Sequence, residues 1–446
     1  MTVFVEDAVL LDAQQRAERL PLSPAEHRRW QEVAAYRAAR RPDPNRDRAA
    51  VLRDLLGLPG ADDRQVLDAT SRLLSDAVTG DAEPAGPAYA LCRQWFDEDV
   101  TQAAPLLELF TGHHRDPEGG PPAADPDLVN RLARWLHQRG VRLRDATVIS
   151  GGFSRLMLDV HWTGGQGTGE HGTSGQGTSG RGVVRIEQDG MFATEGRREA
   201  SVMRILRARG YPVPPILWEE PEPDALGHPF FVMEFVDGRA RTDDEGLDDM
   251  LRALRRLHDL GPDAADEVGA LDGLAPGRGP EQAIDAQLRH WHDVYRSAVP
   301  YPIPLLERGF AWLHANLRPT GPPVVVHGDP GPGNALQDAT GVAAVIDWEL
   351  AHAGDAAEDW AYLALIRGRR LGSPEFWKKK LAATVGVAYD EPTWNAWEAF
   401  NSVKGACVNL TALDVFARTA RPTPDLLAIG VAVHLRFLRR AIDLTR

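Results

Sequence analysis

The sequence is poor in cysteine and in long apolar runs, and both shortages exclude classes of protein. Cys92 and Cys407 are its only cysteines in 446 residues, so we expect no disulfide framework and a reducing compartment. No stretch approaches the roughly 18 apolar residues of a spanning helix, and the N-terminus lacks the basic flank and apolar core of a signal peptide. We therefore expect a cytoplasmic protein without a membrane partner.

Positive charge is also scarce. The formal net charge is −14 and the pI is near 5.5, which argues against a nucleic-acid partner. Only four lysines occur, all late in the chain, and every other strongly basic residue is arginine. The hydrophobic content of 43% is that of an ordinary globular protein, and the length suffices for two or three domains.

What the sequence does contain is a Gly- and Pro-rich loop between two short apolar runs. Residues 324–349 read VVVHGDPGPGNALQDATGVAAVIDWE. The β-branched residues on either side predict two short strands, and the two prolines and three glycines of the loop exclude a helix. Asp329 and Asn334 lie five residues apart on the loop, and Asp347 follows the second strand.

This spacing is typical of a kinase catalytic loop. There an Asp takes the proton of the acceptor hydroxyl, an Asn holds Mg²⁺, and a later Asp holds Mg²⁺ against the phosphates. We assign these roles to Asp329, Asn334 and Asp347 in that order. The alternative, a polar β-hairpin with an Asp-Pro-Gly turn, leaves the placing of the Asn and the second Asp unexplained.

The motif HGDxxxxN followed by IDWE resembles that of the aminoglycoside phosphotransferase and choline-kinase-like superfamily. Within it, the greatest likeness is to kinase-like domains associated with acyl-CoA dehydrogenases. The resemblance covers about residue 125 to the C-terminus and implies an α+β, protein-kinase-like fold with a β-rich N-lobe and a helical C-lobe. It also implies ATP, Mg²⁺ and a small-molecule hydroxyl acceptor as ligands.

Helical patterns fill the first 111 residues, for which we expect a small all-α domain. No catalytic constellation occurs there, so a docking or homo-oligomerisation module is the favoured interpretation. The expected divisions are a helical domain (1–111), a linker (112–125), an N-lobe (126–236) with a disordered insertion (163–182), and a C-lobe (237–446).

Two elements are expected to hold the nucleotide phosphates. A Gly-rich turn between strands, with Gly151, Gly152 and Ser154, would cover them with backbone N–H groups, although Gly-Gly also makes plain hairpins. Arg185 stands on the strand where a kinase places its phosphate-binding lysine, and its permanent charge suits that role. The alternative is an edge-strand arginine facing solvent.

The resemblance assigns the remaining nucleotide contacts. Glu199 falls where the family places the helix glutamate that pairs with the phosphate-binding residue, and Glu195 competes for this position. Glu234 and Val236 would contact the adenine through backbone groups in the segment between the lobes. His327, Asp355 and Asp359 are expected to be structural, and Glu349 is a weaker metal candidate.

The charge of the C-terminal region bears on the nature of the acceptor. Residues 361–446 hold thirteen Lys or Arg and seven acids, a balance of +6 within an acidic chain. This balance favours an acceptor with carboxylate or phosphate, such as a hydroxyacyl-CoA or a hydroxy acid, unless the charges merely coat the outer face. An aminoglycoside or macrolide antibiotic is the second candidate. A nucleotide-binding pseudokinase or regulatory module is the alternative from a different class.

Overall fold

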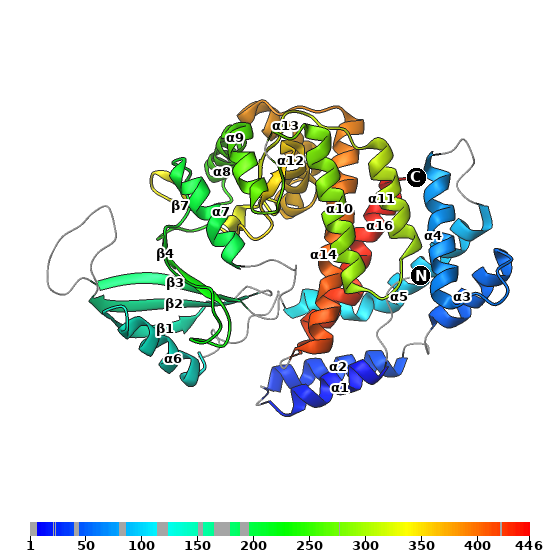
Figure 1. Cartoon of the computed structure of the whole chain (residues 1–446), viewed down its shortest axis with the longest axis horizontal. Helices are drawn as coiled ribbons and strands as arrows, with labels where there is room; N and C mark the ends of the chain where they lie inside the picture. The colour runs from blue at the N-terminus through cyan, green and yellow to red at the C-terminus, as the bar shows by residue number, and fades with distance from the viewer. Residues whose placement is uncertain are drawn as a thin grey trace.

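A five-stranded antiparallel sheet forms one end of the molecule (Figure 1). The computed structural model describes residues 7–20, 22, 24–39, 44–79, 86–113, 124–149, 155–164, 179–187, 196–275, 277–419 and 422–446. The strand order is β1-β2-β3-β5-β4. The strands are β1 (Val141–Val148), β2 (Arg155–Gly164), β3 (Ser179–Glu187), β4 (Ile216–Glu220) and β5 (Phe230–Glu234).

Two helices cover the two faces of this sheet, and we call sheet and helices together the sheet lobe. Helix α6 (Pro126–His137) begins at Asp125, whose side chain caps the Asp127 N–H, and Pro126 occupies the first turn, where a missing N–H costs nothing. It packs against β1 in an apolar cluster that includes Val184 and Val232. Helix α7 (Gly196–Ala208) packs on the opposite face.

Strand β3 runs through the middle of the sheet and alternates between these two faces. Val184 and Ile186 face the α6 cluster, whereas Val183 belongs to the larger core on the α7 side. Because side chains alternate along a strand, Arg185 also points to the α7 side. It is only 6% exposed there. Its central strand and its burial exclude the alternative of an edge arginine facing solvent.

The Gly-rich stretch 163–182 is more ordered at its ends than its composition predicts. Strands β2 and β3 pair up to Thr163 and Ser179, and residues 165–178 lie outside the described part. A Cβ on Gly180 would lie 2.4 Å from the Trp162 ring, and one on Gly182 would lie 2.9 Å from it. The two glycines therefore make room for the indole, whose packing extends the hairpin.

The chain crosses once from the sheet into a helical lobe. Arg239 and Gln337 exchange both backbone hydrogen bonds, at 3.0 and 2.9 Å, which ties the crossing segment to the catalytic-loop region. The helical lobe holds α8 (Asp244–His258), α9 (Gly261–Ala270), α10 (Pro280–Ala298), α11 (Pro304–Asn316), α12 (Ala356–Leu365), α13 (Pro374–Val385), α14 (Glu391–Arg418), α15 (Pro424–Ala428) and α16 (His434–Leu444).

Four short strands frame the catalytic loop, but the two predicted ones do not pair with each other. Strand β6 (Val324–Val326) pairs with β9 (His352–Gly354), and β7 (Ala335–Asp338) pairs with β8 (Gly341–Val345). The loop therefore links two separate ladders, and the interpretation of residues 324–349 as one hairpin is excluded. This arrangement of a sheet lobe and a helical lobe is the predicted α+β kinase-like fold.

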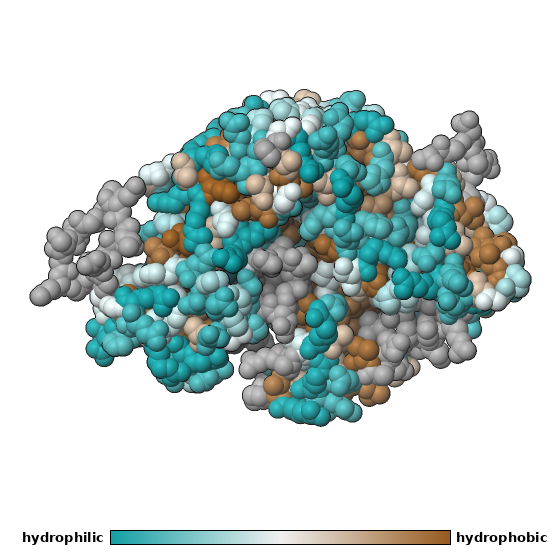
Figure 2. Space-filling model, viewed as in Figure 1, coloured by the Kyte–Doolittle hydropathy of each residue, from teal (hydrophilic) through white to brown (hydrophobic). Residues whose placement is uncertain are grey.

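Most of the N-terminal helices lie against the helical lobe and share its hydrophobic core, whereas α3 (Pro44–Leu55) packs on α4 (Asp63–Thr79) in a separate apolar cluster (Figure 1). The N-terminal helices are α1 (Asp7–Glu18), α2 (Pro24–Ala39), α3 (Pro44–Leu55), α4 (Asp63–Thr79) and α5 (Gly86–His113). Arg29 pairs with Asp425 at 2.9 Å, and Arg16 donates to the Ala417 carbonyl at 2.8 Å. Figure 2 shows apolar surface at the end formed by α3 and α4, where Val51 is 47% exposed.

Within the described residues, no helix is both long and apolar enough to cross a membrane. The domain boundaries and the oligomerisation role of the N-terminal helices stay predictions.

Candidate active site

The catalytic loop turns sharply as it leaves β6. Gly328 has φ +84°, a conformation that side chains disfavour, and a Cβ there would lie 2.5 Å from the Leu350 carbonyl oxygen. Only glycine fits this position. The turn brings the next residue, Asp329, out of the strand direction and onto the loop.

Asp359 holds the backbone at the start of the catalytic loop. Its carboxylate accepts hydrogen bonds from the backbone N–H groups of His327 and Gly328, each at 2.9 Å, and lies 2.9 Å from His258 Nε2. Burial alone would raise the pKa of Asp359, but its hydrogen bond with His258, the nearby charges and the His327 N–H outweigh burial and lower it. The side chain is fully buried, so Asp359 is the structural anchor that the sequence predicts.

A second buried carboxylate holds the same turn through a lysine. Lys404 Nζ lies 2.6 Å from the Gly328 carbonyl oxygen and 2.6 Å from Glu358 Oε1. His352 Nε2 lies 3.0 Å from the other oxygen of Glu358. Burial would raise the pKa of Glu358, but His352 and Lys404 together lower it. Lys404 thus connects α14 directly to the catalytic loop.

Asp329 and Asn334 contact each other across the loop. Asn334 Nδ2 donates to the Asp329 carbonyl at 2.9 Å, and the Asn334 carbonyl accepts the Ile346 N–H at 2.9 Å. Burial raises the pKa of Asp329. Its Oδ2 accepts a hydrogen bond from Arg367 Nη2 at 3.1 Å, and its Oδ1 is buried. The hydroxyl of Tyr362, on α12, interacts with the same carboxylate and opposes the rise in its pKa. The Asp329 side chain is therefore held in place from η3 (Arg367–Arg370) and from α12.

Asp347 has the only positive φ, +71°, among the described non-glycine residues. Such a backbone costs energy and occurs preferentially where function requires it. It directs the Asp347 carboxylate to Arg185, whose Nη2 lies 3.0 Å from Asp347 Oδ1 and 3.3 Å from Glu349 Oε2. Together with the Ile346–Asn334 bond, this brings all three predicted catalytic-loop residues to one region between the lobes.

Arg185 completes a buried ion-pair network. Its Nε lies 2.8 Å from Glu199 Oε2 on α7, and Glu199 is 2% exposed. Burial would lower the pKa of Arg185, but Glu199, Asp347 and Glu349 outweigh it and raise the pKa. The structure therefore pairs Arg185 with Glu199 as the sequence anticipates. Its competitor Glu195 lies outside the described residues.

The other predicted nucleotide residues are partly described. The Glu234 N–H is bonded to the Pro215 carbonyl at 2.9 Å, and Val236 is half-buried in the segment that crosses between the lobes. Gly151, Gly152 and Ser154 lie outside the described residues.

The donor set fits Mg²⁺ in kind. The bond from Asn334 Nδ2 to the loop backbone turns the amide oxygen the other way, and the Asp347 carboxylate is 30% exposed. Mg²⁺ commonly takes one or two protein oxygens and completes its shell with phosphates and water. In the described part of the chain, no cluster of three or more His, Cys, Asp or Glu side chains is arranged to hold a metal.

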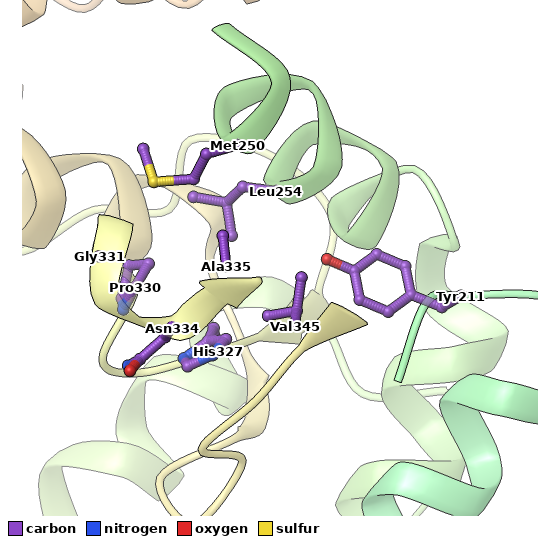
Figure 3. Close-up of a pocket in the computed structure, with 9 residues that line it drawn as sticks. All are labelled: Tyr211, Met250, Leu254, His327, Pro330, Gly331, Asn334, Ala335 and Val345. Atoms are coloured by element: carbon purple, nitrogen blue, oxygen red, sulfur yellow. The ribbon is translucent and has the colours of Figure 1, made fainter. Parts of the chain in front are cut away.

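A small apolar pocket lies behind the loop (Figure 3). Met250 and Leu254 of α8 line one side, and Ala335 and Val345 line the other, around a cavity of about 20 Å³ that is partly open to solvent. This is room for little more than one water molecule, and its lining offers little to phosphate groups. We do not assign the nucleotide to it.

The chain belongs to the phosphotransferase enzyme family, whose model matches residues 171–400, slightly over half of the sequence. It is therefore a phosphotransferase, of a family whose members phosphorylate hydroxyl groups.

Among individual proteins, it is 29% identical over 244 residues to acyl-CoA dehydrogenase family member 10 of Mus musculus. That match covers 47% of this chain and 22% of the relative. The chain spans about a fifth of the length of the curated relatives it matches. The likeness to proteins named for acyl-CoA dehydrogenases confirms the predicted resemblance.

Two solved structures give the fold comparison. A putative aminoglycoside phosphotransferase from Ralstonia eutropha JMP134 is 20% identical, with a TM-score of 0.49, over 71% of this chain and 98% of that one. A spectinomycin phosphotransferase solved with ADP and spectinomycin is 11% identical, with a TM-score of 0.45, over 71% and 98%.

Sequence reasoning missed the specific roles of Arg367 and Lys404. Both were counted only as part of the basic surplus of residues 361–446, yet one contacts Asp329 and the other the loop backbone. The sequence did mark Lys404 as unusual, because this lysine interrupts the apolar run of α14. The structure shows that its side chain is buried, at 2% exposure, which is rare for lysine. Much of the remaining surplus is paired locally, as in Lys378–Glu391 at 2.7 Å and Arg440–Glu398 at 2.7 Å.

Proposed function

We propose that this phosphotransferase moves the γ-phosphoryl group of ATP to a hydroxyl of a small molecule that carries a negative charge. The observation that carries the proposal is the state of Asp329. Its side chain is 20% exposed, Arg367 orients one of its carboxylate oxygens, and Asn334 holds the backbone of the same residue. A general base needs a positioned carboxylate within reach of the acceptor.

In the reaction, the Asp329 carboxylate accepts the hydrogen bond of the acceptor hydroxyl and takes its proton. The acceptor oxygen forms a bond to the γ-phosphorus as the bond to the bridging oxygen breaks, and ADP leaves. Burial raises the pKa of Asp329, which makes its carboxylate a better base. Little other covalent chemistry is needed, since positioning and charge neutralisation supply most of the rate.

Groups from both lobes would neutralise the negative charge of the triphosphate. Arg185, braced by Glu199, supplies positive charge from the sheet lobe. Asn334 and Asp347 would hold Mg²⁺, which would neutralise part of the phosphate charge. The ion pair between Asp347 and Arg185 places these two side chains next to each other between the lobes.

The rest of the nucleotide is assigned to the sheet lobe and the crossing segment. Gly151, Gly152 and Ser154 would cover the phosphates with backbone N–H groups. The Glu234 carbonyl and the Val236 N–H would contact the adenine edge, and the Glu234 N–H is already engaged by Pro215.

An anionic acceptor is favoured over a cationic one by the surroundings of Asp329. The turn that follows α12, η3 (Arg367–Arg370), holds three exposed arginines, of which Arg367 contacts Asp329 and Arg369 lies 3.6 Å from Glu398. Positive charge there would repel an aminoglycoside and attract a carboxylate or phosphate. The relatives named for acyl-CoA dehydrogenases make a hydroxyacyl-CoA or a hydroxy acid the first acceptors to test. A cytoplasmic location is part of the proposal, and both cysteines are free and buried.

The test is ATP turnover with hydroxyacyl-CoAs, hydroxy acids, aminoglycosides and macrolides side by side, with product identified by a phosphate-sized mass gain. Asp329→Asn should lower the rate by at least two to three orders of magnitude. Asp338→Asn, on the exposed end of β7, is the matched control and should leave the rate unchanged. Unaltered turnover in Asp329→Asn would refute the base assignment.

Binding of ATP without consumption by any acceptor would instead favour a regulatory binding module. Selective turnover of aminoglycosides would refute the anionic acceptor while leaving the phosphotransferase reaction intact.

A further inference from the structure

Arg367 lies outside the catalytic loop in sequence, yet its side chain lies on that loop. It begins the turn η3, which follows α12. Its Nη2 donates to Asp329 Oδ2 at 3.1 Å. A Cβ built on Gly331 would lie 3.3 Å from Arg367 Nε and 3.7 Å from its Cβ and Cγ. Arg367 therefore occupies the space that a side chain two residues after Asp329 would otherwise fill.

Gly331 permits this placement without any backbone requirement of its own. Its φ is −169° and its ψ is 161°, an extended conformation that any residue adopts. The missing side chain, and not the glycine backbone, is thus the feature that matters. Gly333, on the same loop, has nothing within 4 Å of an added Cβ.

The two arginines of the site differ in their remaining hydrogen-bonding capacity. Arg185 is 6% exposed and is shared among three carboxylates. Arg367 is 46% exposed in its side chain, and within the described residues its ion pair is with Asp329. A guanidinium has five N–H donors in a planar fork suited to phosphate oxygens. Arg367 therefore has donors beyond the one that it gives to Asp329, and nearly half of its side chain is accessible.

We propose that Arg367 is a catalytic residue that contacts the phosphoryl group during its transfer and neutralises the charge that develops on its outer oxygens. The inference rests on the proposed function. Arg367 donates to the phosphoryl oxygens through Nε or Nη1 while its Nη2 stays on Asp329 Oδ2. The same side chain therefore orients the base and binds the phosphoryl group during its transfer. An arginine supplied from the same chain in this way accelerates phosphoryl transfer in other enzymes by about 10³-fold or more.

The first measurement separates chemistry from nucleotide binding. Arg367→Ala should lower kcat at least about 100-fold and change the KM for ATP less than about threefold. Arg367→Lys should recover part of the loss, and added guanidinium chloride should partly rescue Arg367→Ala. Arg252→Ala is the matched control, because Arg252 is 57% exposed and pairs with Asp249 at 3.0 Å on α8. It should behave as the wild type.

The second measurement does not depend on turnover. Aluminium fluoride with Mg²⁺ and ADP mimics a phosphoryl group in transit, and calorimetry should show that it binds the wild type more tightly than ADP alone. Arg367→Ala should lose most of that increment and keep its affinity for ADP. Gly331→Ala should displace Arg367 and lose part of the increment, whereas Gly333→Ala should keep it.

An undiminished increment in Arg367→Ala, or a kcat within threefold of the wild type, would overturn the inference. Failure of the wild type to phosphorylate any acceptor would overturn the proposed function, and the aluminium fluoride measurement would still decide the role of Arg367.

Discussion

Lys404 offers the sharpest test of how the catalytic loop is held. Its ammonium group is 2% exposed and lies 2.6 Å from both Glu358 Oε1 and the Gly328 carbonyl oxygen. Replacement by methionine keeps most of the stem and removes the charge and both hydrogen bonds. Glu358 is then left as a buried carboxylate whose remaining neighbour is His352.

The magnitude follows from this geometry. At 2.6 Å and an effective dielectric constant near 20, the attraction between the two charges is about 6 kcal/mol before the cost of desolvation. Breaking one side of a buried pair typically costs about 3–5 kcal/mol, because an uncompensated charge stays behind. We expect Lys404→Met to lower the free energy of unfolding by that amount. Lys378→Met, which removes an ion pair to an exposed Glu391, should cost less than about 1 kcal/mol.

The assay is urea unfolding followed by tryptophan fluorescence, for which the chain has twelve reporters. Glu358→Gln and the double variant complete a cycle with Lys404→Met. Because the double variant leaves no unpaired charge, its loss should be at least about 2 kcal/mol smaller than the sum of the single losses. Additivity within about 0.5 kcal/mol, or a single loss below about 1 kcal/mol, would refute the buried-pair account.

Three further predictions follow from the same region. Gly328→Ala should cost more free energy of unfolding than Gly386→Ala, since both replace a glycine of positive φ but only the first meets another atom; equal losses in urea titrations would contradict this. The pKa values of Asp359 and Glu358 are lowered by folding, so their contribution is complete above the unfolded pKa values and is lost as the pH falls through the folded ones. The melting temperature should therefore fall steeply below about pH 4.5, and a flat profile down to pH 3 would contradict it. The pKa of Asp329 is raised instead, so its ionisation opposes folding as the pH rises, and Asp329→Asn should melt at or above the wild-type temperature at pH 7.

Local signals in the sequence sufficed for many of the helices. Helix α13 begins at Pro374, directly after the capping residue Ser373, and ends before Gly386, which adopts the left-handed conformation. These three residues are enough to predict both of its ends. The spacing of Asp329, Asn334 and Asp347 likewise located the site, because the loop and the following hairpin are close in sequence. The roles assigned to these residues stay predictions.

Features that depend on distant parts of the chain escaped prediction. The partner of β6 is the three-residue strand β9, which is too short for periodicity to reveal. The contact between Arg367 and Asp329 spans 38 positions, and that between Lys404 and Gly328 spans 76. No local propensity encodes such contacts, since they arise only after the helices of the helical lobe have packed.

Helix α7 has a consequence for the ion pair between Glu199 and Arg185. Arg198 on this helix contacts the helical lobe: its Nε lies 2.6 Å from Asp272 Oδ1, and its Nη2 donates to the Ala351 carbonyl oxygen at 2.7 Å. Ala200, Met203 and Leu206 of the same helix belong to the core that continues into that lobe. Outward movement of α7 would break these contacts with the helical lobe and separate Glu199 from Arg185. The contacts of Arg198 therefore oppose movement of α7 and help to keep Glu199 beside Arg185.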